Sequence, residues 1–499
     1  MEAKSSLERE LKLTAPSSFR LPDLGGLGAN LSVSSEEVRR ATAVYYDTRD
    51  LRLARWACGL RHRSSDAWTL KLPTAEEGPA LVRREFLFAG PPGRPPEAAL
   101  DLVLAMTRGE PLEEITRLRT VRRRVSILDA SGQWLAEVTN DHVAVLDGRR
   151  VARRFREVEV EFAGGCPPGL VEEIVVRLRR AGTGPAHRVA KHLRALGLES
   201  GVVPEVSLPE VASDDPAAQV VRCAIATSVV ALVRHDPGVR VDEDIEDVHQ
   251  MRVAVRRLRS HLRTFRSLLD EAWARGLQED LRWLGSELGC VRDADVLAGR
   301  FQLAASELPE AERRAAKGLL DRLEQARGAD LERLLHALRS PRFLKLAQRL
   351  VEAAREPRLL PEAEGPARVV VAPLVHGRWK RLARSVDELG SEPEPAELHA
   401  VRIQAKHARY AAETMVPVFG NPMHRFARAL RGVQQTLGHY QDAAVATGWL
   451  RDAAGEVARE AAFAAGMLAA HEQRLGARAL AAWPAAWRKA RDVEARVVY

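Results

Sequence analysis

Two patterns of apolar and polar residues divide the chain. Between about Leu7 and Phe162 apolar and polar residues alternate in short runs, which is typical of strands with one buried face. Beyond a Pro-interrupted polar stretch, apolar residues recur at spacings of three and four, which is typical of helices. The predicted strands are 8–13, 43–46, 59–63, 68–72, 82–88, 121–128, 134–142 and 156–162, and helices are expected at about 97–107 and 170–180. We predict an antiparallel β domain at 1–200, a linker at 201–215 and an all-helical domain at 216–499.

The helical part contains an internal repeat. The segment 249–259, HQMRVAVRRLR, recurs as 399–409, HAVRIQAKHAR. A second segment, 288–293 with the sequence LGCVRD, is echoed by 437–442 with the sequence LGHYQD. The repeat predicts a duplicated helical bundle, with one copy at about 216–350 and the other at about 366–499.

Composition narrows the class of protein. With 499 residues, of which 46% are hydrophobic, the chain can build two or three cored domains and is too apolar to be disordered. The longest apolar run, about Ala224 to Val233, is shorter than a membrane span, and the N-terminus is charged, so we expect neither membrane insertion nor secretion. Four scattered cysteines without C-x-x-C spacing argue against a zinc site or disulfides and favour the cytoplasm. The formal charge of +8 comes largely from arginine, so polyanions are the first partners to consider.

Charged residues recur on one face of several predicted strands. Glu8, Glu10 and Lys12 point the same way because side chains alternate along a strand. The same spacing relates Arg61 to Arg63, Arg122 to Arg124, and the acidic residues Glu157, Glu159 and Glu161 to one another, while Lys71 lies between apolar neighbours. On any one strand a solvated face is the simpler explanation of the pattern. Recurrence over several strands favours inward rows in a closed barrel, where cations suit phosphate oxygens and carboxylates suit hard divalent metal ions.

These strands resemble the CYTH domain of the triphosphate tunnel metalloenzymes over about residues 5–200. The resemblance rests on the opening Glu-x-Glu-x-Lys, on 46–48 (YDT) with Leu51 and Leu53, on 60–63 (LRHR), on 69–71 (TLK) and on the acidic row that ends at Glu161. It implies an eight-stranded antiparallel tunnel barrel that hydrolyses triphosphates with Mg²⁺ or Mn²⁺. Neither a G-x-x-x-x-G-K-[ST] loop nor a helix-opening G-x-G-x-x-G is present, so ATP would be bound through its triphosphate.

The resemblance also implies roles for individual residues. The residues expected to hold metal or to orient the attacking water, and hence the catalytic set, are Glu8, Glu10, Glu159 and Glu161, with Glu85 and Glu137 as further candidates. The residues expected to hold the triphosphate are Lys12, Arg61, Arg63, Lys71, Arg119, Arg122 and Lys191. The family's late Ser-Lys pair is replaced by Ala190 and Lys191, which keeps the lysine and loses the serine.

Basic residues form a stripe on one helix in each copy of the repeat. His249, Arg252, Arg256 and Arg259 share one helix face, and His399, Arg402, Lys406 and Arg409 share the corresponding face. The residue that precedes each of these basic residues belongs to an apolar stripe. The basic residues therefore lie about 100° around the helix from the buried face, at its edge. A solvated charged flank is the plain alternative, and Asp293 and Asp442 are equally good candidates as intramolecular partners of the cations.

The paired segments resemble the CHAD domain, the conserved histidine α-helical domain, over about residues 216–499. This resemblance implies two four-helix bundles related by pseudo-twofold symmetry, whose basic surface binds inorganic polyphosphate through the two stripes. The second copy has Lys406 and His407 where the first has Arg256 and Arg257, so it offers fewer bidentate phosphate contacts.

Together these features predict a cytoplasmic protein whose barrel hydrolyses tripolyphosphate or a nucleoside triphosphate and whose helical domain binds inorganic polyphosphate. An association with polyphosphate granules fits this partner. One alternative is a polyphosphate-binding granule protein whose barrel binds without turnover, and adenylate cyclase or thiamine triphosphatase activity also occurs on this kind of barrel. Nucleic acid is the least favoured partner, because the basic stripes lack the interleaved aromatic residues of a single-strand binding platform.

Overall fold

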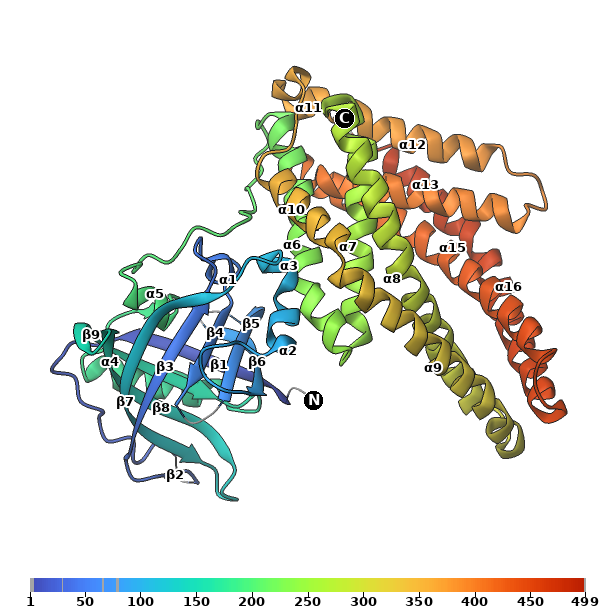
Figure 1. Cartoon of the computed structure of the whole chain (residues 1–499). Helices are drawn as coiled ribbons and strands as arrows, with labels where there is room; N and C mark the ends of the chain where they lie inside the picture. The colour runs from blue at the N-terminus through green and yellow to red at the C-terminus, as the bar shows by residue number, and fades with distance from the viewer. Residues whose placement is uncertain (1–3, 29, 65–66, 78–79, 498–499) are drawn as a thin grey trace. The chain divides into compact units, whose positions relative to one another are not determined.

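The computed structural model describes residues 4–28, 30–64, 67–77 and 80–497, which fold as two compact units, 1–205 and 206–499. Figure 1 labels the elements along the chain. The first unit contains β1 (Lys4–Thr14), β2 (Ser32–Val33), β3 (Glu37–Asp47), α1 (Arg52–Arg55), β4 (Gly59–Arg63), β5 (Ala67–Glu77), β6 (Ala80–Ala89), α2 (Glu97–Leu102), α3 (Leu104–Thr107), β7 (Glu113–Leu128), β8 (Trp134–Asp147), β9 (Arg150–Phe162), α4 (Pro168–Arg180), β10 (Ala186–His187) and α5 (Lys191–Ala195).

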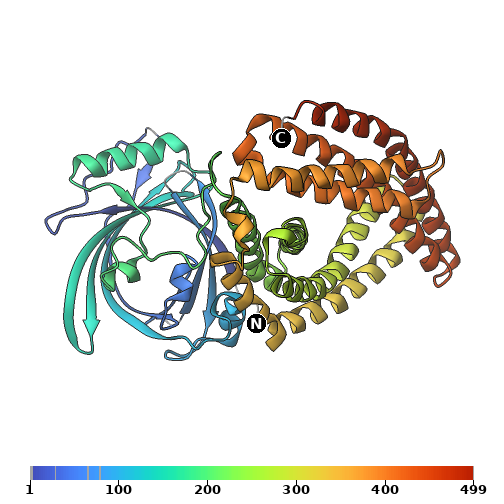
Figure 2. The same cartoon turned by 90° about the horizontal axis from the view of Figure 1, so that it is seen from above.

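The strands of the first unit form a closed antiparallel barrel. Their order is β1-β6-β5-β4-β3-β7-β8-β9, and β9 pairs with β1 to close the ring, as the view in Figure 2 shows. The short strands β10 and β2 add to β1 and β7. This confirms the eight-stranded antiparallel barrel expected from the sequence.

Strand β1 places its charged side chains inside the barrel and its apolar side chains outside. Along β1, Glu8, Glu10 and Lys12 line the interior, while Leu11 and Leu13 are buried on the outer face. Leu13 belongs to an apolar cluster with Ile174 of α4, so this helix covers the outer face of the sheet. Packing around the outside of the barrel leaves the interior free for polar groups, which is why strict alternation in the sequence predicts the inward rows.

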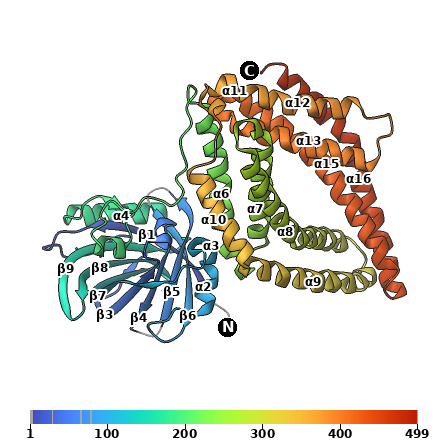
Figure 3. The same cartoon turned by 45° about the horizontal axis from the view of Figure 1, so that its top comes forward.

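The second unit is helical throughout its regular structure. Its first half contains α6 (Ala217–Val241), α7 (Ile245–Thr264), α8 (Glu271–Ser306), α9 (Glu310–Arg339) and α10 (Pro341–Arg355), and its second half contains α11 (Ala367–Val370), α12 (Ala372–Asp387), α13 (Pro395–Thr414), α14 (Val416–Phe419), α15 (Asn421–Ala454) and α16 (Arg459–Glu494). Figure 3 shows the long helix pairs α8 with α9 and α15 with α16, which occupy equivalent places in the two halves. The helical duplication expected from the repeat is therefore confirmed.

The two halves begin side by side. Pro216, just before α6, forms an antiparallel bridge with Pro366, which precedes α11 at the equivalent point of the second copy. The backbone N–H of Ala217 donates to Gly365 O at 2.8 Å, and that of Ala367 donates to Asp215 O at 3.0 Å. The first residues of each half are therefore hydrogen-bonded to the equivalent residues of the other half, as expected for halves related by a pseudo-twofold axis.

Helix α6 is long and apolar enough to span a membrane by length and composition alone. However, 67% of its most apolar window is buried inside the helical unit. Its buried residues include Val221, Ile225, Val229 and Val233, so its apolar character is explained by its position in the core. Cys58, Cys166, Cys223 and Cys290 form no disulfide bonds.

Candidate functional site

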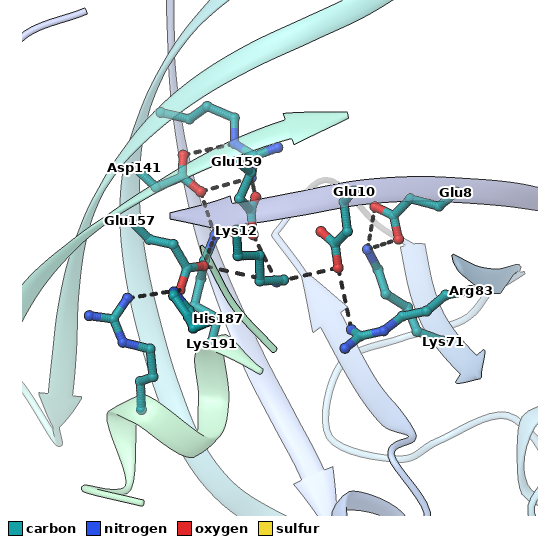
Figure 4. A network of polar contacts seen from close by, with 12 residues as sticks. Glu8, Glu10, Lys12, Lys71, Arg83, Asp141, Glu157, Glu159, His187 and Lys191 are labelled. Atoms are coloured by element: carbon teal, nitrogen blue, oxygen red, sulfur yellow. Dashed lines mark hydrogen bonds and ion pairs between the residues drawn. The ribbon is translucent and has the colours of Figure 1, made fainter. Parts of the chain in front are cut away.

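The barrel encloses a charged cavity of about 340 Å³. Side chains from all eight barrel strands and from α5 line it, and Figure 4 shows contacts among some of them. The residues predicted from the sequence to lie there and found in its wall are Glu8, Glu10, Lys12, Arg61, Arg63, Lys71, Glu85, Arg122, Glu159, Glu161 and Lys191. The cavity volume is in the range of a small-ligand site.

Lys12 lies near the centre of this network and is 5% exposed. Its ammonium Nζ donates to Glu159 Oε1 at 2.9 Å and lies 3.4 Å from Glu10 Oε1. Burial alone would lower the pKa of Lys12, but the carboxylates of Glu10, Glu159 and Glu157 more than offset burial and raise it. Lys12 therefore stays charged at physiological pH.

A second group of paired charges lies beside Lys12. Arg122 donates through Nε and Nη2 to both carboxylate oxygens of Asp141, at 2.8 and 2.7 Å, and also from Nη2 to Glu159 Oε2 at 2.7 Å. Lys191, the first residue of α5, contacts Asp141 and lies 3.3 Å from Glu159. Cations thus surround Glu159 and hold its pKa well below the usual range although burial opposes this. Glu159 orients Lys12, Arg122 and Lys191.

The remaining carboxylates form a row across neighbouring strands. Glu161 on β9 is the cross-strand partner of Glu10 on β1 and of Glu137 on β8. Burial and the neighbouring carboxylates of Glu8 and Glu137 raise the pKa of Glu161 to about 7, against an opposing effect of Lys71. Such a row is stabilised when a cation neutralises it.

The donor set of this row fits a hard divalent cation. Glu8, Glu10 and Glu161 present carboxylate oxygens on adjacent strands, and the carboxylate of Glu161 forms no ion pair or hydrogen bond with the other described side chains. Among the residues that the structure describes, no three acidic, histidine or cysteine side chains are already arranged as a metal centre. Glu8 instead accepts from Lys71 at 2.6 Å, and Glu10 lies 3.5 Å from Arg83 Nη1.

Two arginines on β4 face the cavity, and they differ in compensation: Tyr45 and Glu85 offset the burial of Arg61 and raise its pKa, whereas Arg63 has little compensation. Arg63 forms no hydrogen bond or ion pair with the described residues, and Arg61 lies 3.8 Å from the carboxylate of Glu85. The neighbouring Arg61, burial and Arg122 together lower the pKa of Arg63 to about 10. A bound anion would relieve this repulsion, so the pair is built to receive negative charge.

Arg119 was predicted to hold phosphate, but the structure places it elsewhere. It is exposed and does not line the cavity, because Arg119 and Arg122 are an odd number of residues apart on β7 and therefore point to opposite faces. Arg122 takes the inward position. Glu137 also does not line the cavity and contacts Arg124 at 3.1 Å.

Sequence reasoning missed several cavity residues. Arg83 lies two residues from Glu85 on β6 and shares its inward face, so the alternation that indicated Glu85 could have found it. Asp141 lies at an even spacing from Glu137 on β8 and is fully buried between Arg122 and Lys191. Tyr45 accepts from Arg61 Nη1 at 3.4 Å, and its ring stacks on that of His192 at 4.9 Å. No charge pattern in the sequence indicates Tyr45.

The basic stripes of the helical unit lie where the repeat places them. The predicted apolar stripes are buried, including Val248, Met251 and Val255 on α7 and Val401 and Ala405 on α13. The neighbouring cations are half-buried at the helix shoulder, with Arg409 more deeply buried, and they are His249, Arg252, Arg256, Arg259, His399, Arg402, Lys406 and Arg409. These positions are consistent with a surface between helices and exclude a fully solvated flank.

The two stripes act on each other. Ser260 Oγ lies 2.8 Å from His407 Nδ1, so α7 and α13 are in direct contact. Burial, Arg256 and Arg402 are the three largest causes that lower the pKa of Lys406 to about 7, so cations from both copies act on one lysine. We call the residues Arg252, Arg256, Arg259, Arg402 and Lys406 the basic cluster.

Equivalent glycines make room for equivalent arginines in the two copies. A Cβ added to Gly289 on α8 would lie 3.6 Å from Arg252 Nη2, and one added to Gly438 on α15 would lie 3.4 Å from Arg402 Nε. The guanidinium groups therefore lie against the next helix of each copy. Asp293 forms an ion pair with Arg252 at 3.1 Å, which confirms one of the two intramolecular partners suggested by the sequence.

Several donors near the basic cluster lack a protein acceptor. The Nε atoms of Arg256, Arg402 and Arg409 are buried without a hydrogen bond to the described residues. Arg409 is held near Glu413 at 3.4 Å and over the ring of Tyr410 at 4.6 Å, contacts that the sequence did not indicate. Buried donors without acceptors are costly, and an anionic ligand would satisfy those that face the surface.

Comparison with known proteins gives matches for both units. Residues 6–184 match the CYTH domain, and residues 223–451 match the CHAD domain. A protein of Mycobacterium tuberculosis described as uncharacterized is 30% identical over 512 residues, which span 97% of this chain and 96% of its own. PptA from Streptomyces chartreusis is 26% identical and covers 55% of this chain and 100% of its own, with a TM-score of 0.47. The CHAD domain from the plant Ricinus communis is also 26% identical, covers 57% of this chain and 95% of its own, and has a TM-score of 0.47.

Proposed function

Because this chain belongs to the family of proteins that join a CYTH domain to a CHAD domain, we propose that its barrel is a metal-dependent inorganic triphosphatase. The observation that carries this proposal is the cavity itself. It brings cations from β1, β4, β5, β6 and β7 and from α5 to one enclosed site, together with a carboxylate row on β1 and β9.

The residues divide the work of phosphoryl transfer to water. Lys12, Arg122 and Lys191 are fixed by buried carboxylates and hold phosphate oxygens, and Arg61 and Arg63 receive the remaining negative charge. Glu8, Glu10 and Glu161 are the residues that would hold Mg²⁺ or Mn²⁺, which when bound supplies charge neutralisation for the phosphates. Glu10 is 3% exposed, is held near Lys12 and Arg83 through Oε1, and would orient the attacking water. Such transfer needs positioning and charge stabilisation more than a protein nucleophile.

The first experiment is phosphate release from tripolyphosphate, ATP and long-chain polyphosphate, each with Mg²⁺, with Mn²⁺ and with a chelator. We expect metal-dependent release from tripolyphosphate, because the cavity is lined by cations that suit phosphate oxygens and by carboxylates that suit a metal ion. Absence of release from every substrate with either metal would favour the alternative, a barrel that binds without turnover. If phosphate is released faster from ATP than from tripolyphosphate, the substrate is a nucleoside triphosphate and not an inorganic one.

For the helical domain we propose binding of inorganic polyphosphate at the basic cluster. What supports this is the convergence of unpaired cations from both copies, which is unfavourable unless an anion compensates them. A protein with these two sites would reside in the cytoplasm and associate with polyphosphate granules.

Long-chain polyphosphate and duplex DNA of matched charge should be titrated into the full chain at physiological salt. We expect tighter binding of polyphosphate, because its closely spaced phosphates follow a compact cluster, and a steep loss of affinity with salt. If DNA binds as tightly as polyphosphate, the helical domain is not specific for polyphosphate and nucleic acid becomes a candidate partner.

A further inference from the structure

Helices α7 and α13 contact each other at two places that the repeat makes equivalent. At one place Arg257 Nη2 donates to Glu413 Oε2 at 3.0 Å. At the other place Arg263 Nη1 lies 3.3 Å from His407 Nε2. In the repeat Arg257 corresponds to His407. Glu413 corresponds to Arg263, so the first copy has an arginine where the second copy has a carboxylate.

The carboxylate of the second copy lies at the centre of a group of arginines. Besides accepting from Arg257, Glu413 Oε1 lies 3.4 Å from Arg409 Nη1 and 3.3 Å from Arg431 Nη2. These three guanidinium groups come from α7, α13 and α15. One carboxylate of the protein therefore compensates three cations from three helices.

The first copy keeps equivalent arginines but lacks this carboxylate. Arg409 corresponds to Arg259 on α7, and Arg431 corresponds to Arg282 on α8. A Cβ added to Gly285 would lie 3.7 Å from Arg259 Nη1, so the guanidinium of Arg259 lies against α8, the helix that carries Arg282. Among residues 206–497, all of which the structure describes, Arg259 and Arg282 form no hydrogen bond or ion pair.

A buried arginine from a third helix adds to this group. Arg378 on α12 is only 5% exposed and forms no hydrogen bond or ion pair with the residues described in the helical unit. Helix α12 packs against α13, as Figure 3 shows, and also contacts α7. Burial and then Arg381 and Arg263 lower the pKa of Arg378 to about 10, and burial and then Arg282 and Arg263 lower that of Arg259. A buried cation without a partner is costly, and a bound anion would offset this cost.

We propose that the first copy binds a phosphate group at the place that the Glu413 carboxylate occupies in the second copy. The residues of this site, which we call the first-copy anion site, are Arg259, Arg263, Arg282 and Arg378. Guanidinium groups match the oxygens of carboxylates and of phosphates alike, so a phosphate would accept hydrogen bonds as Glu413 does. The first copy would thus take up an external anion where the second copy carries its own.

The site has a consequence for the path of polyphosphate. Arg259 belongs both to the basic cluster and to the first-copy anion site, so a chain bound at the cluster would continue onto Arg263 and Arg282. In the second copy the carboxylate of Glu413 would repel the chain. Polyphosphate would therefore extend from the cluster over the first copy only, and this consequence rests on the proposed function of the helical domain.

The test is a charge exchange at the centre of the site. Arg263→Glu gives the first copy the carboxylate of the second, so the variant should fold and its site should no longer accept an anion. Arg263→Ala removes one cation without adding an acid, and it serves as the second variant. Arg478→Glu makes the same charge change at an exposed position of α16 and is the matched control. Far-UV circular dichroism checks that each full-length variant is folded.

Long-chain polyphosphate and orthophosphate are titrated separately into each protein at constant ionic strength. Relative to the wild type, polyphosphate should bind roughly 5-fold less tightly to Arg263→Ala and roughly 25-fold less tightly to Arg263→Glu, because each unit of charge contributes about 0.7 log unit at 0.1 M salt. Arg478→Glu should bind like the wild type. Orthophosphate should raise the midpoint of thermal unfolding, followed by the helical circular dichroism signal, for the wild type and Arg478→Glu but not for Arg263→Glu.

The two ligands identify the source of the phosphate group. A loss in Arg263→Glu of the response to polyphosphate alone assigns the site to the chain, and a loss of the response to orthophosphate alone assigns it to free phosphate. If the wild type does not bind polyphosphate but orthophosphate stabilises it and not Arg263→Glu, the proposed function of the helical domain fails and the anion site stands. If Arg263→Glu and Arg263→Ala respond to both ligands like the wild type, the inference is wrong.

Discussion

The duplicated basic cluster makes a quantitative prediction about long-chain polyphosphate. Replacing Arg252 and Arg256 with Ala removes two cations from the first copy, and replacing Arg402 and Lys406 removes two from the second. Each phosphate contact on a flexible polyanion contributes about 0.7 log unit of affinity at 0.1 M salt through counterion release, so two contacts amount to roughly 25-fold. Arg252 is already partly neutralised by Asp293 at 3.1 Å, which reduces the expected loss for the first pair to about tenfold.

The second pair should respond to pH in a way that the first does not. Lys406 is largely protonated at pH 6 and largely neutral at pH 8, because its pKa in the free protein is about 7. The loss caused by Arg402→Ala with Lys406→Ala should therefore be larger at pH 6 than at pH 8, while the loss from the first pair stays nearly constant.

The assay is polyphosphate affinity against chain length and salt, for both double variants and for Lys317→Ala with Lys345→Ala, two exposed lysines of the first half, as the control. Tripolyphosphate binding to the helical domain should respond less than long-chain binding, because a long chain engages both copies at once. If either cluster variant binds long chains like the wild type, or if affinity is already constant at three phosphates, the two copies do not share one ligand.

Three further predictions follow from single residues. Glu10→Gln should lower kcat for tripolyphosphate by at least about 100-fold, while the protein still folds because Lys12 keeps its contact with Glu159 at 2.9 Å. Circular dichroism checks the fold, and Glu37→Gln, at an exposed position, is the control. A kcat within twofold of the wild-type value would contradict the role of Glu10. Lys191→Met should destabilise the barrel by on the order of 3 kcal/mol in urea unfolding, because Asp141 and Glu159 lose a buried cation, and an unchanged midpoint would contradict this. Polyphosphate affinity of the wild type should fall as pH rises through about 7, where free Lys406 loses its proton, whereas Lys406→Arg should show a flatter profile in the same titration.

The sequence predicted the barrel well because its inward rows are local. Alternation places Glu8, Glu10 and Lys12 on one face without knowledge of any other strand, and closure of the barrel then brings such rows together. Alternation along β7 already puts Arg119 on the face opposite to Arg122 and Arg124, so the sequence contained the signal that excludes Arg119. Asp141 was missed because its importance comes from Arg122 and Lys191, which reach it from another strand and a helix.

The fold and the basic stripes of the helical domain could also be predicted from the sequence, but for a different reason. Duplication allows each copy to be compared with the other, so shared residues such as Arg252 and Arg402 could be recognised, and the apolar stripe beside them is buried as expected. The shifted pKa of Lys406 could not be predicted, because it depends on arginines of α7 packed against α13. Contacts between copies are tertiary information that the repeat alone does not contain.

The most direct test of the central claim is to follow tripolyphosphate by ³¹P NMR in the presence of the full chain and Mg²⁺ or Mn²⁺. With the wild type the tripolyphosphate resonances should convert to those of diphosphate and orthophosphate, while Glu10→Gln should leave bound tripolyphosphate intact. Tripolyphosphate that binds to the wild-type barrel and stays unhydrolysed with both metals would contradict the claim that this cavity is a triphosphatase.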